Sequence, residues 1–344
     1  MIPENTNNLS NSQLRCGIVL AAGDGRRMQD FVYRQRGDWL PKQYINFIGK
    51  RSMLEHTFHR AEKLIPPERL FVIIAKQHLS FPDVHRQIAS RQPSMVVTQP
   101  QNKDTAPGLL LPLLHVYKRF PEAPVAVFPS DHFILEEDVF IQHVDRAFRL
   151  VESDRSRIAL LGIEPTDPDP EYGYIVPGET VDDPEHHGAR KVEMFVEKPS
   201  REAAKKIIRR DALVNTLVVV FSCNTLMDAI KHTVPELHRS FQSILEAIGT
   251  AEEDRVIDKV YQKLPSVNFC KDVVENLSVE RRQALVVLPV QGVTWSDWGV
   301  SERLSSILRQ LRDSDHLQPK PAISPPSKLS PRKNVLVMPP KRIQ

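Results

Sequence analysis

The chain has 344 residues, of which 41% are hydrophobic, and a net charge of +3. This length suits one large α/β domain or two small ones, with enough apolar residues for a sizeable core. No apolar run approaches the ~20 residues of a membrane-spanning helix, so we expect no membrane partner. Residues 1–14 are polar and lack the apolar stretch of a secretory signal. Cys16, Cys223 and Cys270 are odd in number and widely spaced, which predicts reduced thiols in a cytoplasmic protein.

Strand and helix patterns alternate along the first half of the chain. We expect strands at residues 16–22, 69–75, 94–99, 123–129 and 157–163, with helical patterns between them. One helix opens with Ser52 and has Glu55 three residues later, the pattern of a capping box. This alternation predicts an α/β fold with a mixed, mainly parallel central sheet flanked by helices, in which ligands bind beyond the carboxyl ends of the strands.

The second half is less regular. Strands are expected at residues 172–177, 190–199, 213–223 and 284–290. Helices are expected at about residues 200–210, at 224–248 and, as a short segment, after Gly299.

The last residues differ in composition from the rest. Residues 316–344 contain six basic residues, seven of the 28 prolines and no Asp or Glu. Such a segment cannot bury a core, so we expect residues 314–344 to form a disordered tail and residues 1–14 a flexible N-terminus. A basic arm for an acidic partner is the alternative to a plain solvated tail.

A turn rich in glycine and arginine follows the first expected strand. Gly23 and Gly25 permit positive φ and close approach of a ligand to backbone N–H groups, which favour phosphate, and Arg26 adds charge. Met28 occupies the place of the third glycine in a dinucleotide fingerprint, and no P-loop sequence is present. The stretch therefore predicts either a different phosphate-binding turn or an ordinary turn with solvated arginines, and it disfavours a nicotinamide-dependent oxidoreductase.

Polar residues also follow the other strands. Each alone has an ordinary explanation: Asp131 suits a helix N-cap, and Lys198 suits a solvated loop. Together they suit a triphosphate with Mg²⁺, an ion that takes oxygen ligands and often needs only one or two carboxylates. The group comprises Gln99, Asn102, Thr105, Asp131, Glu197, Lys198 and Asp297, with Arg26 and Lys42 nearer the N-terminus.

Several strings of the sequence resemble the sugar-nucleotide pyrophosphorylase superfamily. LAAGDGR (20–26) and LPKQ (40–43) resemble its shared signature. NKDTAP, FPSDHFI, LLGIEPTDPDPEYGYI and FVEKPS resemble the bacterial mannose-1-phosphate guanylyltransferase branch, in family order. The resemblance implies a Rossmann-like nucleotide-diphospho-sugar transferase domain at residues 15–313. It also implies that a hexose-1-phosphate attacks a nucleoside triphosphate, with GTP and mannose-1-phosphate as the expected pair and Mg²⁺ as the cofactor.

The resemblance further implies roles for individual residues. Arg26 and Lys42 would hold the triphosphate, Lys198 the sugar phosphate, and Asp131 and Asp297 the metal; the three cations are the expected catalytic groups. Gly173, Glu197 and Asn215 would face the sugar. The nucleotide would also contact Leu20, Ala21, Ala22, Gly23, Gly25, Gln99, Thr105 and Ser130. We expect no nucleic-acid partner, and a homodimer is the assembly to test.

Three departures from the family pattern bear on specificity. LAAG replaces the usual Leu-Ala-Gly-Gly, the spacer at residues 27–41 is long, and Leu217 stands where the family has glycine. Another base and sugar pair, or a non-catalytic relative that binds nucleotide sugars, are therefore the alternatives.

Overall fold

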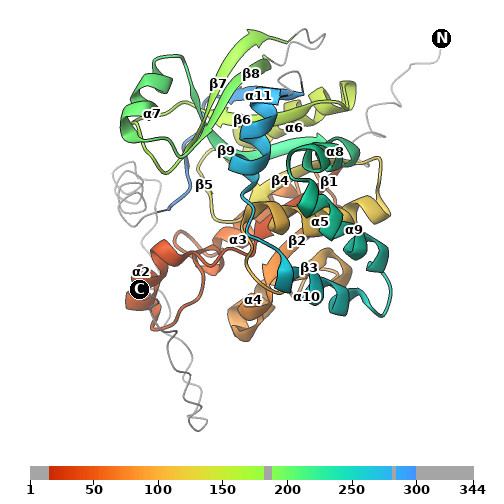
Figure 1. The fold of residues 1–344 in the computed structure, drawn as a ribbon. Coiled ribbons are helices and arrows are strands. Elements are labelled where there is room, and N and C mark those ends of the chain that lie inside the picture. The colour runs from red at the N-terminus through yellow and green to blue at the C-terminus, as the bar shows by residue number, and fades with distance from the viewer. Residues whose placement is uncertain (1–14, 182–187, 281–283, 300–344) are drawn as a thin grey trace, which may run out of the picture.

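The computed structural model describes residues 15–181, 188–280 and 284–299. The expected N-terminus and tail and the short helix after Gly299 lie outside these residues. A nine-stranded sheet occupies the centre, in the order β3-β2-β1-β4-β9-β6-β10-β8-β7 (Figure 1). Its strands are β1 (Cys16–Ala21), β2 (Leu70–Ala75), β3 (Val96–Gln99), β4 (Pro124–Pro129), β6 (Ile158–Ile163), β7 (Gly173–Thr180), β8 (Arg190–Glu197), β9 (Leu213–Ser222) and β10 (Leu285–Val290).

The sheet is mixed, with most strands pointing the same way. β1 is parallel to β2 and β4, β2 to β3, and β6 to β10. β9 is antiparallel to β4, β6 and β7, and β8 is antiparallel to β10 and β7. β8 and β9 thus run against the rest of the sheet, which confirms the expected mixed, mainly parallel arrangement.

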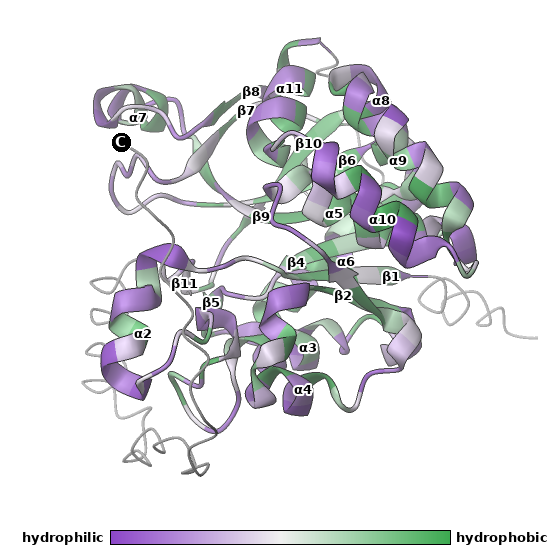
Figure 2. Ribbon diagram, turned by 60° about the horizontal axis from the view of Figure 1, so that its bottom comes forward, coloured by the Kyte–Doolittle hydropathy of each residue, from purple (hydrophilic) through white to green (hydrophobic). Residues whose placement is uncertain are grey.

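Helices cover both faces of the sheet because the strands bury side chains on both sides. In β1, Cys16 and Ile18 join the core beneath α5 (Thr105–Arg119), α8 (Cys223–Thr233), α9 (Pro235–Ala247) and α10 (Glu253–Lys263). Val19 and Ala21 join the opposite core, beneath α3 (Met53–Ala61), α4 (Pro82–Ile88) and α6 (Glu137–Ser153). The central strands are largely hydrophobic, whereas α10 and α2 (Gln29–Arg36) carry many hydrophilic residues (Figure 2).

Smaller elements complete the described chain. A separate apolar cluster joins β7 to α7 (Arg201–Ile208). β5 (Phe133–Ile134) and β11 (Trp295–Ser296) form a two-stranded sheet of their own. The remaining helices and turns are η1 (Arg26–Met28), η2 (Lys42–Tyr44), η3 (Pro67–Arg69), η4 (Lys76–Ser80), η5 (Pro93–Met95), η6 (Phe269–Glu275) and α11 (Asn276–Glu280).

Most of the expected elements are confirmed, with shifts of a few residues. Ser52 caps α3 in a capping box with Glu55, as expected. The single helix expected at residues 224–248 is wrong, because the chain forms α8 and α9 with Val234 between them at φ −135°. Pro235 explains the break: it has no N–H and its ring would clash with the preceding turn, but it is tolerated at the first position of a new helix.

The parallel strands determine where the site lies. The carboxyl ends of β1, β3 and β4 meet at one edge of the sheet, so the segments after Ala21, Gln99 and Pro129 lie close together. Among the described residues, none of the helices combines the length and the apolar character needed to cross a bilayer.

Candidate active site

The glycine turn after β1 has a defined shape. Gly25 has φ 61° and ψ 31°, the left-handed conformation that disfavours side chains, and its carbonyl accepts the Met28 N–H at 2.9 Å. The buried Gln43 donates from Nε2 to the carbonyls of Ala21 (2.9 Å) and Gly23 (2.8 Å). Because the buried Gln43 side chain donates to both carbonyls, it holds the backbone of the turn in place.

A pocket of about 480 Å³ opens beside this turn. Gln99 lies in its wall, 1% exposed, and its Oε1 has no hydrogen-bond partner. Thr105 begins α5, and its hydroxyl accepts the Phe269 N–H at 2.8 Å. The lining includes six residues expected to bind nucleotide: Leu20, Ala22, Gly23, Arg26, Gln99 and Thr105.

Four other residues expected to bind nucleotide are not among those that line this pocket: Ala21, Gly25, Lys42 and Ser130. Ser130 donates from both its N–H (3.1 Å) and its hydroxyl (2.7 Å) to the Leu20 carbonyl, tying the end of β4 to β1. The side chain of Ala21 belongs to the core on the other face of the sheet. The side chain of Arg26 is 82% exposed and pairs with Asp24 at 3.5 Å, so it can reorient toward a ligand at little cost.

Lys42 is at the centre of the site. Its side chain is buried, and its ammonium contacts Asp131 Oδ2 at 2.9 Å, the Asp297 carbonyl at 2.8 Å and the Trp298 carbonyl at 3.2 Å. Three acceptors match the three donors of an ammonium group. One cation therefore joins the segment after β4 to the segment after β11, which are far apart in sequence.

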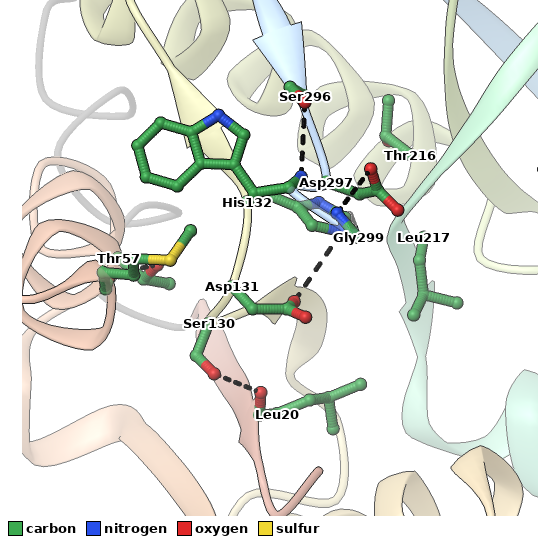
Figure 3. A network of polar contacts seen from close by, with 12 residues as sticks. Leu20, Thr57, Ser130, Asp131, His132, Thr216, Leu217, Ser296, Asp297 and Gly299 are labelled. Atoms are coloured by element: carbon green, nitrogen blue, oxygen red, sulfur yellow. Dashed lines mark hydrogen bonds and ion pairs between the residues drawn. The ribbon is translucent and has the colours of Figure 1, made fainter. Parts of the chain in front are cut away.

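Asp131, His132 and Asp297 gather beyond the end of the strand that carries Leu20 (Figure 3). Burial opposes the charge of Asp131, but Lys42 and His132 hold the pKa of this carboxyl below its ordinary value, against a smaller repulsion from Asp297. Asp297 Oδ1 accepts the Tyr172 hydroxyl at 3.2 Å and the Gly299 N–H at 3.1 Å. The carboxyl groups of Asp131 and Asp297 thus lie near enough to repel each other, and the negative charge between them favours a bound cation.

The residues present are compatible with a magnesium ion. The ammonium of Lys42 contacts the carboxylate of Asp131 and the main-chain carbonyl of Asp297, so a cation already occupies the space beside both residues. Within the described part of the chain, no group of three or more His, Cys, Asp or Glu is arranged for a metal. Two carboxylates are nevertheless sufficient for Mg²⁺ when phosphate oxygens supply the remaining ligands.

The residues expected to face the sugar lie on β7, β8 and β9. Gly173 pairs with Glu197, and a Cβ at position 173 would lie 2.6 Å from Glu197 Oε2, so a side chain there would displace the carboxylate. Burial raises the pKa of Glu197 to about 7; repulsion from Glu275 and Asp104 adds to this rise, while Lys198 opposes it. Asp104 caps α5 and lines the pocket beside the glycine turn, so this interaction places Glu197 near that pocket.

Two backbone positions on the sugar side have unusual conformations. The exposed Lys198 has φ 48°, and its N–H donates to the Tyr172 carbonyl at 3.2 Å. Leu217 has φ 56°, and its N–H donates to Asn215 Oδ1 at 3.1 Å. The departure from glycine at this position therefore does not abolish the left-handed conformation, which Asn215 supports and Leu217 adopts at a cost in strain.

The sequence did not single out the residues that support this site. Gln43 fixes the glycine turn, Tyr44 donates to the Ala21 carbonyl at 3.0 Å, and Tyr172 holds Asp297. Gln43 lies in the string LPKQ and Tyr172 in the string EYGYI, so membership of these family-like strings was the sequence signal that could have identified them.

A second pocket, of about 530 Å³, lies between α3 and the segment around β5. It is lined in part by His56, His59, Phe133 and Trp298, and by none of the expected site residues. The candidate active site is therefore the edge of the sheet that carries the glycine turn, Lys42 and Glu197.

Comparison with known proteins identifies the family. A sequence model described as nucleotidyl transferase matches residues 16–314. The chain is 25% identical over 296 residues to the xanthan biosynthesis protein XanB of Xanthomonas campestris pv. campestris (strain B100), covering 85% of this chain and 59% of that protein. It is 27% identical over 286 residues to a mannose-1-phosphate guanylyltransferase of Escherichia coli, covering 82% and 57%. The chain thus spans less than two thirds of the length of these curated relatives.

Solved structures of similar proteins share the fold of this chain. A Thermus thermophilus protein described as a mannose-1-phosphate geranyltransferase is 26% identical with a TM-score of 0.70, over 86% of this chain and 80% of that one. A UDP-glucose pyrophosphorylase of Acinetobacter baumanii shares the fold, with a TM-score of 0.53 at 14% identity over 88% and 94%. The fold, the arrangement of the strand ends and the match across most of the sequence lead to one conclusion: this chain belongs to the nucleotidyl transferase family.

Proposed function

We propose that this protein joins a sugar-1-phosphate to a nucleoside triphosphate, giving a nucleoside-diphosphate sugar and pyrophosphate, with mannose-1-phosphate and GTP as its substrates. The observation that carries this proposal is the Lys42 ammonium, which joins the Asp131 carboxylate to the main-chain carbonyl of Asp297, whose own carboxylate lies near enough to act on Asp131. A cation and two carboxylates at that place suit the meeting point of two phosphate groups. The choice of mannose-1-phosphate and GTP is further supported by the Escherichia coli relative, which is named as a mannose-1-phosphate guanylyltransferase.

The chemistry requires little covalent work from the protein. An oxygen of the sugar phosphate bonds to the α-phosphorus, and the bond from that phosphorus to the bridging oxygen of pyrophosphate breaks. Mg²⁺ would neutralise the triphosphate and stabilise the charge that develops on it. The chain's own residues bind and align the reactants: Arg26 and Lys42 hold the triphosphate, and Lys198 holds the sugar phosphate.

Gln99 supports recognition of a base with hydrogen-bond donors. Its buried Oε1 has no partner, and such an atom costs roughly 1–3 kcal/mol until a donor arrives. Guanine carries an N–H and an amino group side by side on its Watson–Crick edge. Ala22, where the family usually has a glycine, lines the same pocket, so the assay below varies the base as well as the sugar.

A matrix of nucleoside triphosphates against sugar-1-phosphates, read by pyrophosphate release with and without Mg²⁺, tests the proposal. We expect Mg²⁺-dependent release that is fastest with GTP and mannose-1-phosphate. Another pair turned over at least tenfold faster would replace this specificity and leave the reaction class intact. Nucleotide binding without pyrophosphate release from any pair would instead favour a non-catalytic binding protein.

A further inference from the structure

Trp295 lies between the two halves of the candidate site. It forms β11 with Ser296 and pairs with Ile134 of β5. Its side chain packs against the large core under α6 and also against the small cluster that joins β7 to α7. The first contact belongs to the half that carries Asp131, and the second to the half that carries Glu197 and Lys198.

On the first side, Trp295 fixes the imidazole behind Asp131. Its Nε1–H donates to His132 Nδ1 at 3.3 Å, and the two rings meet edge to face with centroids 5.1 Å apart. Because the indole N–H can only donate, Nδ1 must accept, which leaves the proton of a neutral His132 on Nε2. Nε2 lies 3.8 Å from Asp131 Oδ1, so the dipole of this N–H favours the carboxylate although the separation exceeds that of a direct hydrogen bond.

On the second side, Trp295 packs against the residue that holds Asp297. The rings of Trp295 and Tyr172 have centroids 5.6 Å apart, and the Tyr172 hydroxyl donates to Asp297 Oδ1 at 3.2 Å. The Tyr172 carbonyl also accepts the N–H of Lys198. A single indole ring therefore contacts the immediate supports of both carboxylates and, through Tyr172, the backbone of the sugar-phosphate lysine.

We propose that Trp295 is a positioning residue that sets the separation and orientation of Asp131 and Asp297, acting on the first through His132 and on the second through Tyr172. This inference rests on the proposed function, in which the two carboxylates hold the divalent metal. Residues that orient metal ligands typically change metal affinity about 10–100-fold when removed. Because His132 Nε2 lies 3.8 Å from Asp131 Oδ1, beyond hydrogen-bond distance, we expect loss of the indole N–H to weaken metal binding by an amount near the lower end of that range.

The test titrates the protein into a preformed Mn²⁺–GTP complex, without sugar phosphate, and measures the protein-bound Mn²⁺ by electron paramagnetic resonance. The same complex without protein gives the baseline, because GTP itself binds Mn²⁺. Trp295→Phe keeps a ring and loses the N–H to His132, and it should weaken Mn²⁺ binding by about tenfold. Tyr172→Phe keeps the ring packing and loses the hydroxyl to Asp297, and it should weaken binding by a similar factor. Trp39→Phe is the matched control, because Trp39 is 49% exposed and stacks on Tyr33 away from these residues; it should leave the affinity unchanged.

A double-mutant comparison separates positioning from general destabilisation. If Trp295 acts through His132, adding Trp295→Phe to His132→Ala should cost little more than His132→Ala alone. Fully additive losses, or an affinity in Trp295→Phe equal to that in Trp39→Phe, would overturn the positioning role. No Mn²⁺ binding by the unmodified protein would overturn the metal site itself, which distinguishes failure of the proposed function from failure of this inference.

Discussion

Glu197 should make the stability of this protein depend on pH in a way that one substitution removes. Burial, together with the charges of Glu275 and Asp104, raises the pKa of its carboxyl from 4.5 to about 7 in the folded protein. Between these values the folded state keeps a proton that the unfolded chain releases, so the free energy of unfolding falls as pH rises and levels off above about 7. A rise of about 2.5 in pKa, at about 1.36 kcal/mol each, corresponds to at most about 3 kcal/mol.

Glu197→Gln removes this titration and keeps the shape of the side chain. The free energy of unfolding of the variant, measured with urea from about pH 5 to about pH 8, should exceed that of the unmodified protein by an amount that grows toward ~3 kcal/mol at the alkaline end. Glu193→Gln on the same strand is the control: Glu193 is exposed and pairs with Arg210 at 2.7 Å, so its curve should run parallel to that of the unmodified protein. Parallel curves for Glu197→Gln as well would refute the raised pKa of the partly buried Glu197 carboxyl.

Three further predictions concern the phosphate and metal contacts. Asp131→Asn removes the carboxylate beside Lys42 and should lower turnover by at least about a hundredfold, since a bound metal stabilises such transition states by several kcal/mol. The circular dichroism spectrum should remain unchanged. A near-normal rate would show that Asp131 has only a structural role. Arg26→Ala should raise KM for the nucleotide and Lys198→Ala that for the sugar phosphate, each by roughly tenfold to a hundredfold with the other substrate saturating; equal effects on both substrates would contradict two separate clamps. Gly25→Val forces a β-branched residue to φ 61° and should weaken nucleotide binding, measured by calorimetry, by about tenfold. In Gly25→Ala the new Cβ would lie at an ordinary 3.5 Å from Lys42, so any loss of affinity there reports backbone strain alone. Normal nucleotide binding by both variants would show that the turn does not bind phosphate.

The positions of the predicted site residues follow from features that a sequence displays. Apolar runs mark the strands, and polar residues directly after them must lie at the edge where parallel strands end. This rule places Gln99 and Thr105 beside Gly23 in one pocket, and Asp131 beside Lys42. The family pattern predicts that Gly173 and Glu197 both face the sugar, but it does not predict that they pair. The antiparallel register of β7 and β8 places Gly173 opposite Glu197, with its Cα close to the carboxylate.

The supporting contacts could not be predicted in this way. The pairing of Lys42 with the carbonyls of Asp297 and Trp298 depends on a loop conformation that strand patterns do not encode. The position of Trp295 depends on a two-stranded sheet too short to give a periodic signal. The left-handed conformation of Leu217 also cannot be predicted from the sequence, because leucine disfavours it and the hydrogen bond to Asn215 that supports it forms only in the folded chain.

The threefold coordination of the Lys42 ammonium has a consequence for how the site fills. Asp131 already has a counter-ion that is tethered to the same chain, so its effective concentration is high and a free divalent cation must compete with it. A triphosphate changes this balance, because it offers the displaced ammonium a new anionic partner. Metal and nucleotide should therefore enter cooperatively, each raising the affinity of the other by the same factor, as thermodynamic linkage requires. Under the proposed function, such a site would exchange its internal ion pair between Lys42 and Asp131 for the complete metal–nucleotide complex as the substrates bind.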